Sequence, residues 1–164
     1  MHYFAYGSNM LTARLAKRVG RVQPLGPAWL KGHALRFHKR GSDGSGKCNA
    51  FATGRPGDLV HGVLFDINEA RLRRLHAAEG PGYEFAQVQV NTEEGTLPAM
   101  SYRARNIWID DALAPYTWYQ AFVLAGAREH KLPAAYVAYI ENLFARHDPN
   151  GWRAFRNRLF LRRA

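Results

Sequence analysis

Two short stretches of the chain carry residue types that could take part in chemistry. The first is Tyr6-Gly7-Ser8-Asn9, where a glycine, a hydroxyl and an amide follow apolar and aromatic residues. Glycine lets a ligand approach the backbone closely, and the N–H groups at the start of a helix attract anions such as carboxylates. Ser8 and Asn9 would add donors, and Tyr6 would wall the site or add its hydroxyl. Taken alone, the turn is explained more simply as an ordinary helix start.

The second stretch is HAAEGPGY at 76–83, which contains Glu79. This glutamate is expected in the last turn of a helix, where the helix dipole disfavours a negative charge by roughly 0.3–1 kcal/mol. The position favours the protonated carboxyl group, which suits a residue that gives and takes a proton near neutral pH. A surface glutamate tolerates this small penalty easily, so Glu79 alone does not establish a site.

Motifs for other chemistries are absent from the sequence. The seven histidines form no HExxH spacing, and Cys48 has no second cysteine for a metal site or a disulfide. The chain also lacks the GxSxG, GxxxxGK[ST] and GxGxxG patterns. The sequence therefore predicts no metal centre, no hydrolase triad and no nucleotide-binding loop.

The elements that position the two stretches can be read from hydrophobic periodicity. YFAY at 3–6 predicts a buried strand, and 10–19 predicts a short helix with Asn9 as its N-cap. A second helix over 68–79 would begin at an asparagine and end at the glycine that follows Glu79. Gly7 and Glu79 would thus lie at the ends of neighbouring elements rather than inside them.

The rest of the chain is rich in strands up to about residue 104. Short β-like pieces fill 23–65, and strands at 83–92 and 97–104 are joined by a hairpin turn. The segment 116–147 is largely helical, with an interruption at 131–133. Because strands cluster instead of alternating with helices, we predict an α+β fold with a mixed or antiparallel sheet that could close into a small barrel.

The composition indicates a single globular domain over residues 1–164. The hydrophobic fraction is 47% and the charged fraction 22%, and no apolar run approaches the roughly 20 residues of a membrane span. A lone cysteine and an N-terminus without an export signal favour a cytoplasmic protein. The net charge is +10, and residues 146–164 supply half of it with six arginines and one aspartate.

Four segments between Tyr3 and Pro133 together carry a resemblance to a known protein family. They are YFAYGSNM, ATGRPGDLVHGVLFDI, a helix ending in AAEGPGY, and APYTWYQAFVLAGAREHKLP. Together they resemble the γ-glutamylcyclotransferase family, whose broader fold is shared by AIG2-like plant proteins and γ-glutamylamine cyclotransferases. The YGSN turn and the glutamate before glycine are the most specific parts of the resemblance. The basic C-terminal segment lies outside it.

The resemblance implies a small β-barrel with flanking helices and a reaction that needs no cofactor. A γ-glutamyl compound would cyclise to 5-oxoproline and release its amine or amino acid. By position, Glu79 matches the catalytic acid/base of the family. The substrate-binding positions are Tyr3, Phe4, Ala5, Tyr6, Gly7, Ser8, Asn9 and, lining the site further along the chain, Tyr119. The resemblance is also compatible with a homodimer.

The chemistry of this reaction suits these residue types. The substrate's α-amine attacks its own γ-carbonyl, so good orientation alone can contribute roughly 7–11 kcal/mol. A glycine turn would hold the α-carboxylate, and one carboxylate can first accept and then donate the proton. The sequence leaves open which γ-glutamyl compound is used, and whether the role is scavenging or removal of a γ-glutamyl protecting group in biosynthesis.

A non-catalytic binding protein of the same fold is the alternative. In the basic C-terminal segment, Trp152, Phe155 and Leu159 share one helical face among arginines, which could contact nucleic acid, an anionic membrane or an acidic partner. A terminal helix packed on the domain with solvated arginines explains the pattern more simply. We therefore expect a small-molecule γ-glutamyl partner, and neither a membrane nor nucleic acid.

Overall fold

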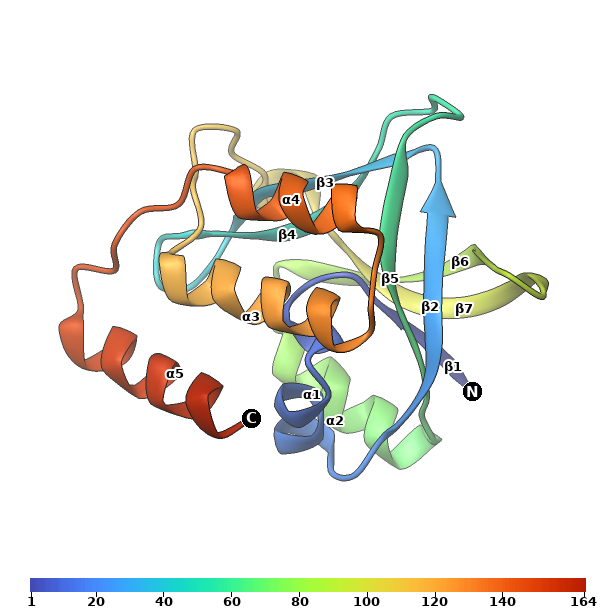
Figure 1. The fold of residues 1–164 in the computed structure, drawn as a ribbon, viewed down its shortest axis with the longest axis horizontal. Coiled ribbons are helices and arrows are strands. Elements are labelled where there is room, and N and C mark those ends of the chain that lie inside the picture. The colour runs from blue at the N-terminus through green and yellow to red at the C-terminus, as the bar shows by residue number, and fades with distance from the viewer.

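Five strands close into a barrel in the computed structural model, which describes residues 1–164 (Figure 1). Strand β1 runs parallel to β7, and all other neighbouring pairs are antiparallel. The predicted α+β fold with a small mixed barrel is therefore confirmed. Around the barrel the strands are β1 (His2–Ala5), β5 (Leu59–Asp66), β2 (Gln23–Lys31), β6 (Tyr83–Thr92) and β7 (Gly95–Ala104).

Two further strands, β3 (His33–Arg40) and β4 (Gly46–Ala52), form a separate antiparallel sheet. Their register shifts between Arg36 and Lys39, so that Lys39 lies opposite Lys47. Gly46 comes so close to the Phe37 carbonyl that no side chain fits there. This small sheet brings two lysines to one place, which matters for the site.

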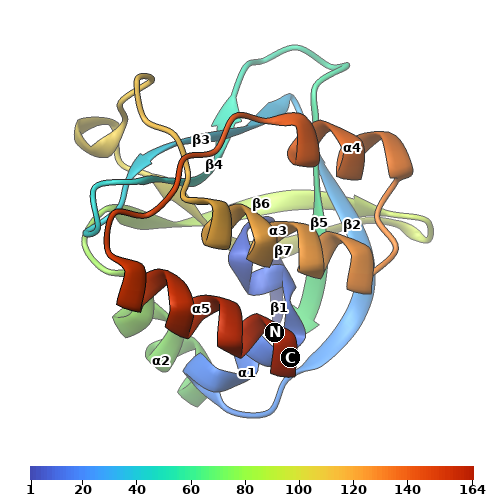
Figure 2. The same ribbon diagram turned by 60° about the vertical axis from the view of Figure 1, so that its left-hand side comes forward.

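Helix α3 (Thr117–Glu129) is the centre of the helical layer. It lies between α4 (Ala134–Asn142) and α5 (Gly151–Arg163) in both ribbon views (Figure 1 and Figure 2). It also packs on the short 3-10 helix η1 (Ser8–Met10), which follows β1. The turn that follows β1 thus lies between the barrel and α3.

The two remaining α-helices pack on each other below the barrel (Figure 1). They are α1 (Thr12–Val19) and α2 (Glu69–Glu79). A second 3-10 helix, η2 (Asn106–Trp108), follows β7. A single cluster of 33 buried hydrophobic residues joins the barrel to the helices, and Phe4, Phe65 and Phe122 are its largest fully buried members.

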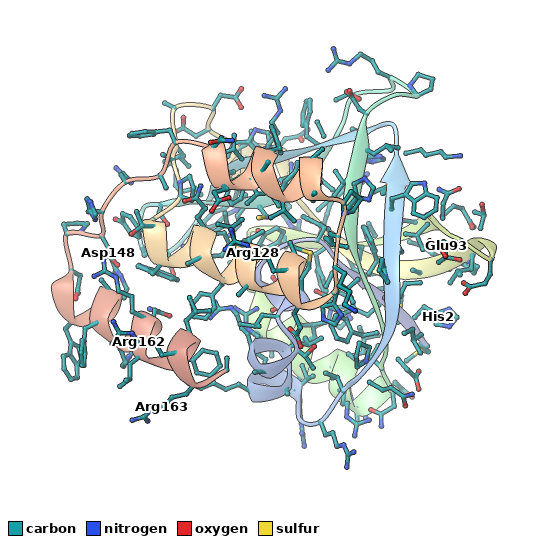
Figure 3. The ribbon with its side chains drawn as sticks, in the orientation of Figure 1. His2, Glu93, Arg128, Asp148, Arg162 and Arg163 are labelled. Atoms are coloured by element: carbon teal, nitrogen blue, oxygen red, sulfur yellow. The ribbon has the colours of Figure 1, made fainter.

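The basic C-terminal segment is an integral part of this fold. The buried Asp148, labelled beside the start of α5 in Figure 3, accepts a hydrogen bond from Trp118 Nε1 at 2.8 Å and pairs with Arg153, which fixes the start of this helix. Phe160 then packs on Phe122 of α3, with ring centroids 5.8 Å apart. The opposite face of α5 leaves Trp152 exposed. None of the helices combines the length and apolar character needed to span a lipid bilayer.

Candidate active site

A cavity of about 280 Å³ opens where β1 runs into η1, beside the end of α2 and the start of α3. Most of the residues that the sequence predicts for the site line it. They are Tyr3, Tyr6, Gly7, Ser8, Asn9, Glu79 and Tyr119. Phe4 and Ala5 do not line the cavity, because they pair with Leu64 and Val63 of β5 and their side chains are buried in the core.

Glu79 is the last residue of α2, as predicted. Asn68 caps the start of this helix by accepting a hydrogen bond from Arg71 N–H, and Gly80, with φ of 70°, ends it. The Glu79 side chain is only 12% exposed. Its Oε1 accepts hydrogen bonds from Asn9 Nδ2 at 2.8 Å and from Arg18 at 3.2 Å. The carboxylate therefore lies beside the early turn in space, and its catalytic role remains a prediction.

The prediction for Asn9 as a helix cap is wrong. The 3-10 turn of η1 intervenes, so α1 starts only at Thr12 with Leu11 in the N-cap position. The Asn9 amide is instead buried and donates to both Glu79 and the Tyr3 hydroxyl, the latter at 3.0 Å. Asn9 thus orients the carboxylate, and its amide oxygen is a buried acceptor without a partner.

Gly7 is needed for space rather than for an unusual backbone conformation, because its φ is −115°. A side chain at this position would meet Cys48 Cβ at 3.1 Å and the Tyr119 hydroxyl at 3.5 Å. The Gly7 carbonyl accepts from Met10 N–H, whereas the Gly7 N–H donates to no group of the chain. One backbone donor of the turn is therefore free to bind a ligand.

The tyrosine hydroxyls of the cavity fall into two classes by the direction of their hydrogen bonds. Tyr6 and Tyr83 donate to the carbonyls of Tyr102 and Cys48, so their protons are already in use. The Tyr3 hydroxyl accepts from Asn9 Nδ2, so its proton remains available to a ligand, whereas the Tyr119 hydroxyl accepts from Cys48 N–H and can direct its proton either to the Cys48 thiol or to a ligand. Tyr6 therefore forms part of the cavity wall, and the hydroxyls of Tyr3 and Tyr119 are the ones that can donate to a ligand.

Four cationic side chains in the cavity were not predicted from the sequence: Arg14, Arg18, Lys39 and Lys47. Against two carboxylates, Glu79 and Asp43, they leave the cavity with a charge of +2. Burial, reinforced by the nearby Arg18 charge, lowers the pKa of Arg14 to about 10. The 23 basic residues are spread through the chain without a motif, so no sequence signal singles out these four.

Cys48 lines the cavity but is poorly suited to act as a nucleophile. Burial raises the pKa of its thiol to about 12, although Tyr119 and Lys47 act in the opposite direction. No group of three or more histidine, cysteine or acidic side chains is arranged to hold a metal ion. Cys48 therefore does not compete with Glu79, for which the acid/base role stays a prediction.

Comparison with known proteins identifies the family of the chain. The sequence profile of the AIG2-like family matches residues 59–140. A γ-glutamylcyclotransferase from Bos taurus is 30% identical over 158 residues, which cover 92% of this chain and 80% of the bovine protein. The chain belongs to the γ-glutamylcyclotransferase family. The human γ-glutamylcyclotransferase is 33% identical over 141 residues, covering 82% of this chain and 73% of its own.

Solved structures extend the family resemblance to the whole chain. A γ-glutamyl cyclotransferase structure superposes with a TM-score of 0.88 at 26% identity and covers 100% of this chain and 99% of its own. An uncharacterized human protein gives a TM-score of 0.86 at 28% identity, covering 98% of this chain and 97% of its own. The similarity therefore includes α5, which the sequence resemblance left outside.

Proposed function

We propose that this protein is a cyclotransferase that converts a γ-glutamyl compound to 5-oxoproline and releases the amine or amino acid, with Glu79 as general acid/base. The observation that carries this proposal is the hydrogen bond from Asn9 to Glu79, which joins the carboxylate to the glycine turn in one cavity. The curated relatives, which are named γ-glutamylcyclotransferases, support the same reaction.

The cavity can hold the substrate in a folded conformation. The free N–H of Gly7 and the unpaired guanidinium of Arg14 are suited to the α-carboxylate of the γ-glutamyl group. The Glu79 carboxylate, which Asn9 orients, can accept from the α-ammonium group. Holding the amine against the γ-carbonyl converts binding energy into a lower barrier, because the attack is intramolecular.

A single carboxylate can carry all of the proton transfers. The α-ammonium group loses one proton to become nucleophilic and a second after it attacks the γ-carbonyl. The departing nitrogen needs the same two protons to leave as an ammonium group, so the reaction has no net proton uptake. Glu79 can pass these protons in turn, and Arg18 at 3.2 Å stabilises its charged form between transfers.

The carbonyl oxygen gains negative charge during the attack and needs donors. The Tyr119 hydroxyl is suited to this, because it accepts from Cys48 N–H at 3.2 Å and its own proton can turn from the neighbouring Cys48 thiol to a ligand. A preformed donor of this kind typically contributes about 10²–10³-fold to the rate. The fold holds this hydroxyl beside the turn through α3, which carries Tyr119 and packs on η1.

The exposed aromatic face of α5 is the one observation that favours the alternative of a binding protein. Trp152 and Phe155 are 69% and 54% exposed, and their rings stack with centroids 5.8 Å apart. This surface could coexist with catalysis, whereas the cavity would have no role in a protein that only binds through α5. We therefore retain the cyclotransferase as the proposed function.

Incubation with a panel of γ-glutamyl compounds tests the proposal. The panel contains γ-glutamyl dipeptides, γ-glutamyl amines and glutathione, and 5-oxoproline is quantified without added metal. We expect at least one compound other than glutathione to yield 5-oxoproline. If no compound does so, while the protein is retained on DNA in a salt-dependent manner, the binding alternative replaces the cyclotransferase.

A further inference from the structure

Helix α5 presents two large aromatic side chains to solvent. Trp152 is 69% exposed and Phe155 is 54% exposed, and their rings stack with centroids 5.8 Å apart. Single exposed apolar residues are common on protein surfaces, but two adjacent aromatic rings form a patch that favours contact with a partner. The helix lies at the edge of the molecule with one side on α3, so its other side is open to such a partner (Figure 2).

Arginines border this patch along the whole helix. With about 3.6 residues per turn, Trp152, Phe155 and the partly exposed Leu159 form a narrow apolar stripe. Exposed arginines lie along its two edges, two on each side: Arg156 and Arg163, and Arg158 and Arg162. None of these four is in an ion pair, because the one ion pair of α5 is that of Arg153 with Asp148. Their charges are therefore free to attract an anionic partner.

The neighbouring helix α1 extends the positive surface. Lys17 is exposed, and its Nζ lies 4.7 Å from the centre of the Phe160 ring, which joins the two helices. Arg21, just after α1, is also exposed and has no acidic partner, and neither helix contains an aspartate or a glutamate. Figure 3 shows Arg163 reaching away from the domain at the end of α5. The four arginines of α5 with Lys17 and Arg21 thus make six positive charges that no carboxylate of the chain compensates.

The charge and shape of this surface argue against two kinds of partner. In a symmetric dimer through α5, the arginines of the two copies would face each other, and like charges in contact oppose association. Single-stranded nucleic acid is usually held in a positively charged groove, whereas these residues lie on the outer side of a helix and line no part of the candidate active-site cavity. A flat anionic surface needs neither a groove nor a matching shape.

We propose that α5 docks this protein peripherally on an anionic lipid bilayer. Tryptophan and phenylalanine favour the boundary between headgroups and acyl chains, and arginines on both sides of them would bind the negative headgroups. The expectation from the sequence that no membrane is bound assumes a packed helix with solvated arginines, and the exposure of Trp152 and Phe155 removes this assumption. The inference is independent of the proposed cyclotransferase function.

Co-sedimentation of the full chain with lipid vesicles tests the proposal. Phosphatidylcholine vesicles that contain about 30% phosphatidylserine are compared with vesicles of phosphatidylcholine alone, at about 0.1 M salt. We expect the partition constant to be at least about tenfold larger for the anionic vesicles. It should fall at least about tenfold at about 0.5 M salt, because salt screens exposed charges.

A double variant separates the contribution of α5 from the general positive charge of the chain. In Trp152→Ala combined with Arg156→Gln, the partition constant for anionic vesicles should fall about 10–100-fold, of which the arginine accounts for about fivefold. Ile107→Ala combined with Arg105→Gln is the matched control, because Ile107 is 89% exposed on η2 and Arg105 is exposed beside it. The control loses the same charge and one exposed apolar side chain, and should stay within about twofold of wild type. Both variants change exposed side chains, so their unfolding midpoints should remain close to wild type.

Three results would overturn the proposal. The first is equal binding of the wild type to anionic and neutral vesicles, or to neither. The second is equal binding of the α5 variant and the control, which would mean that net charge alone holds the protein. The third is tighter binding of the wild type to a single-stranded oligonucleotide or to polyglutamate than to the anionic vesicles, per unit of charge, with loss of that binding in the α5 variant. Nucleic acid or an acidic protein would then be the partner of this surface.

Discussion

A single methyl group at Gly126 tests how the fold positions the substrate turn. Gly126 lies in α3 where this helix packs on the end of η1. A Cβ atom there would be 2.5 Å from Leu11 N and 2.7 Å from the Met10 carbonyl carbon, whereas ordinary contact begins at 3.4 Å. In Gly126→Ala, α3 and this segment must therefore separate by about 0.7–0.9 Å.

This separation should affect both stability and activity. Overpacking of this size typically costs about 1–3 kcal/mol, which lowers the midpoint of thermal unfolding by about 2–12 °C in a chain of 164 residues. The segment that moves directly follows Gly7 and Asn9. Since a misplacement near 1 Å can cost about 100-fold in rate, we expect kcat/KM for 5-oxoproline formation to fall about 10–100-fold.

Thermal unfolding followed by circular dichroism and steady-state release of 5-oxoproline measure the two effects. Gly151→Ala is the matched control, because it makes the same change in a helix at a position with open space. It should leave the activity unchanged and the stability unchanged or slightly raised. If Gly126→Ala keeps the wild-type midpoint and kcat/KM, close packing of α3 on η1 is not what positions the turn.

Two further residues give independent predictions. Hydrogen bonds from Arg153 hold the pKa of Asp148 at about 2, below its ordinary 3.8, so the stability that Asp148 adds is complete above about pH 4 and lost as the pH falls through 2. Asp148→Asn should thus lower the free energy of unfolding by about 1–3 kcal/mol at pH 7 and change it little at pH 2, as measured by urea unfolding. An equal decrease at both pH values would contradict this reasoning. Because burial raises the pKa of Cys48 to about 12, a thiol reagent at pH 8 should label it only in denaturant. Rapid labelling of the native protein would disprove its burial.

Local signals in the sequence were sufficient for the elements that carry the site. Asn68 and Gly80 mark the two ends of α2 with common cap chemistry, and this places Glu79 at the last position of the helix. The hairpin of β6 and β7 follows equally from its alternation and its turn residues. Such signals act between residues that are close in the sequence, so the packing of distant segments does not alter the elements that they predict.

The parts that the sequence did not predict depend on contacts between distant segments. Asn9 has the residue type of an N-cap, but its hydrogen bonds to Glu79 and Tyr3 become possible only once α2 packs beside the turn. Lys39 and Lys47 reach the cavity through the shifted register of β3 and β4, which no local pattern fixes. Phe4 and Ala5 belong to the core because β1 pairs with β5 along its whole length.

The rate of Glu79→Gln measures the central claim most directly. The amide keeps the shape of the side chain but cannot carry a proton, so kcat for the best γ-glutamyl substrate should fall about 10²–10⁴-fold. Substrate binding measured by calorimetry and the unfolding midpoint should remain close to wild type. Glu69→Gln, at an exposed position of the same helix, is the control and should be fully active. A Glu79→Gln protein that retains most of the wild-type rate would contradict the assignment of this carboxylate as the acid/base.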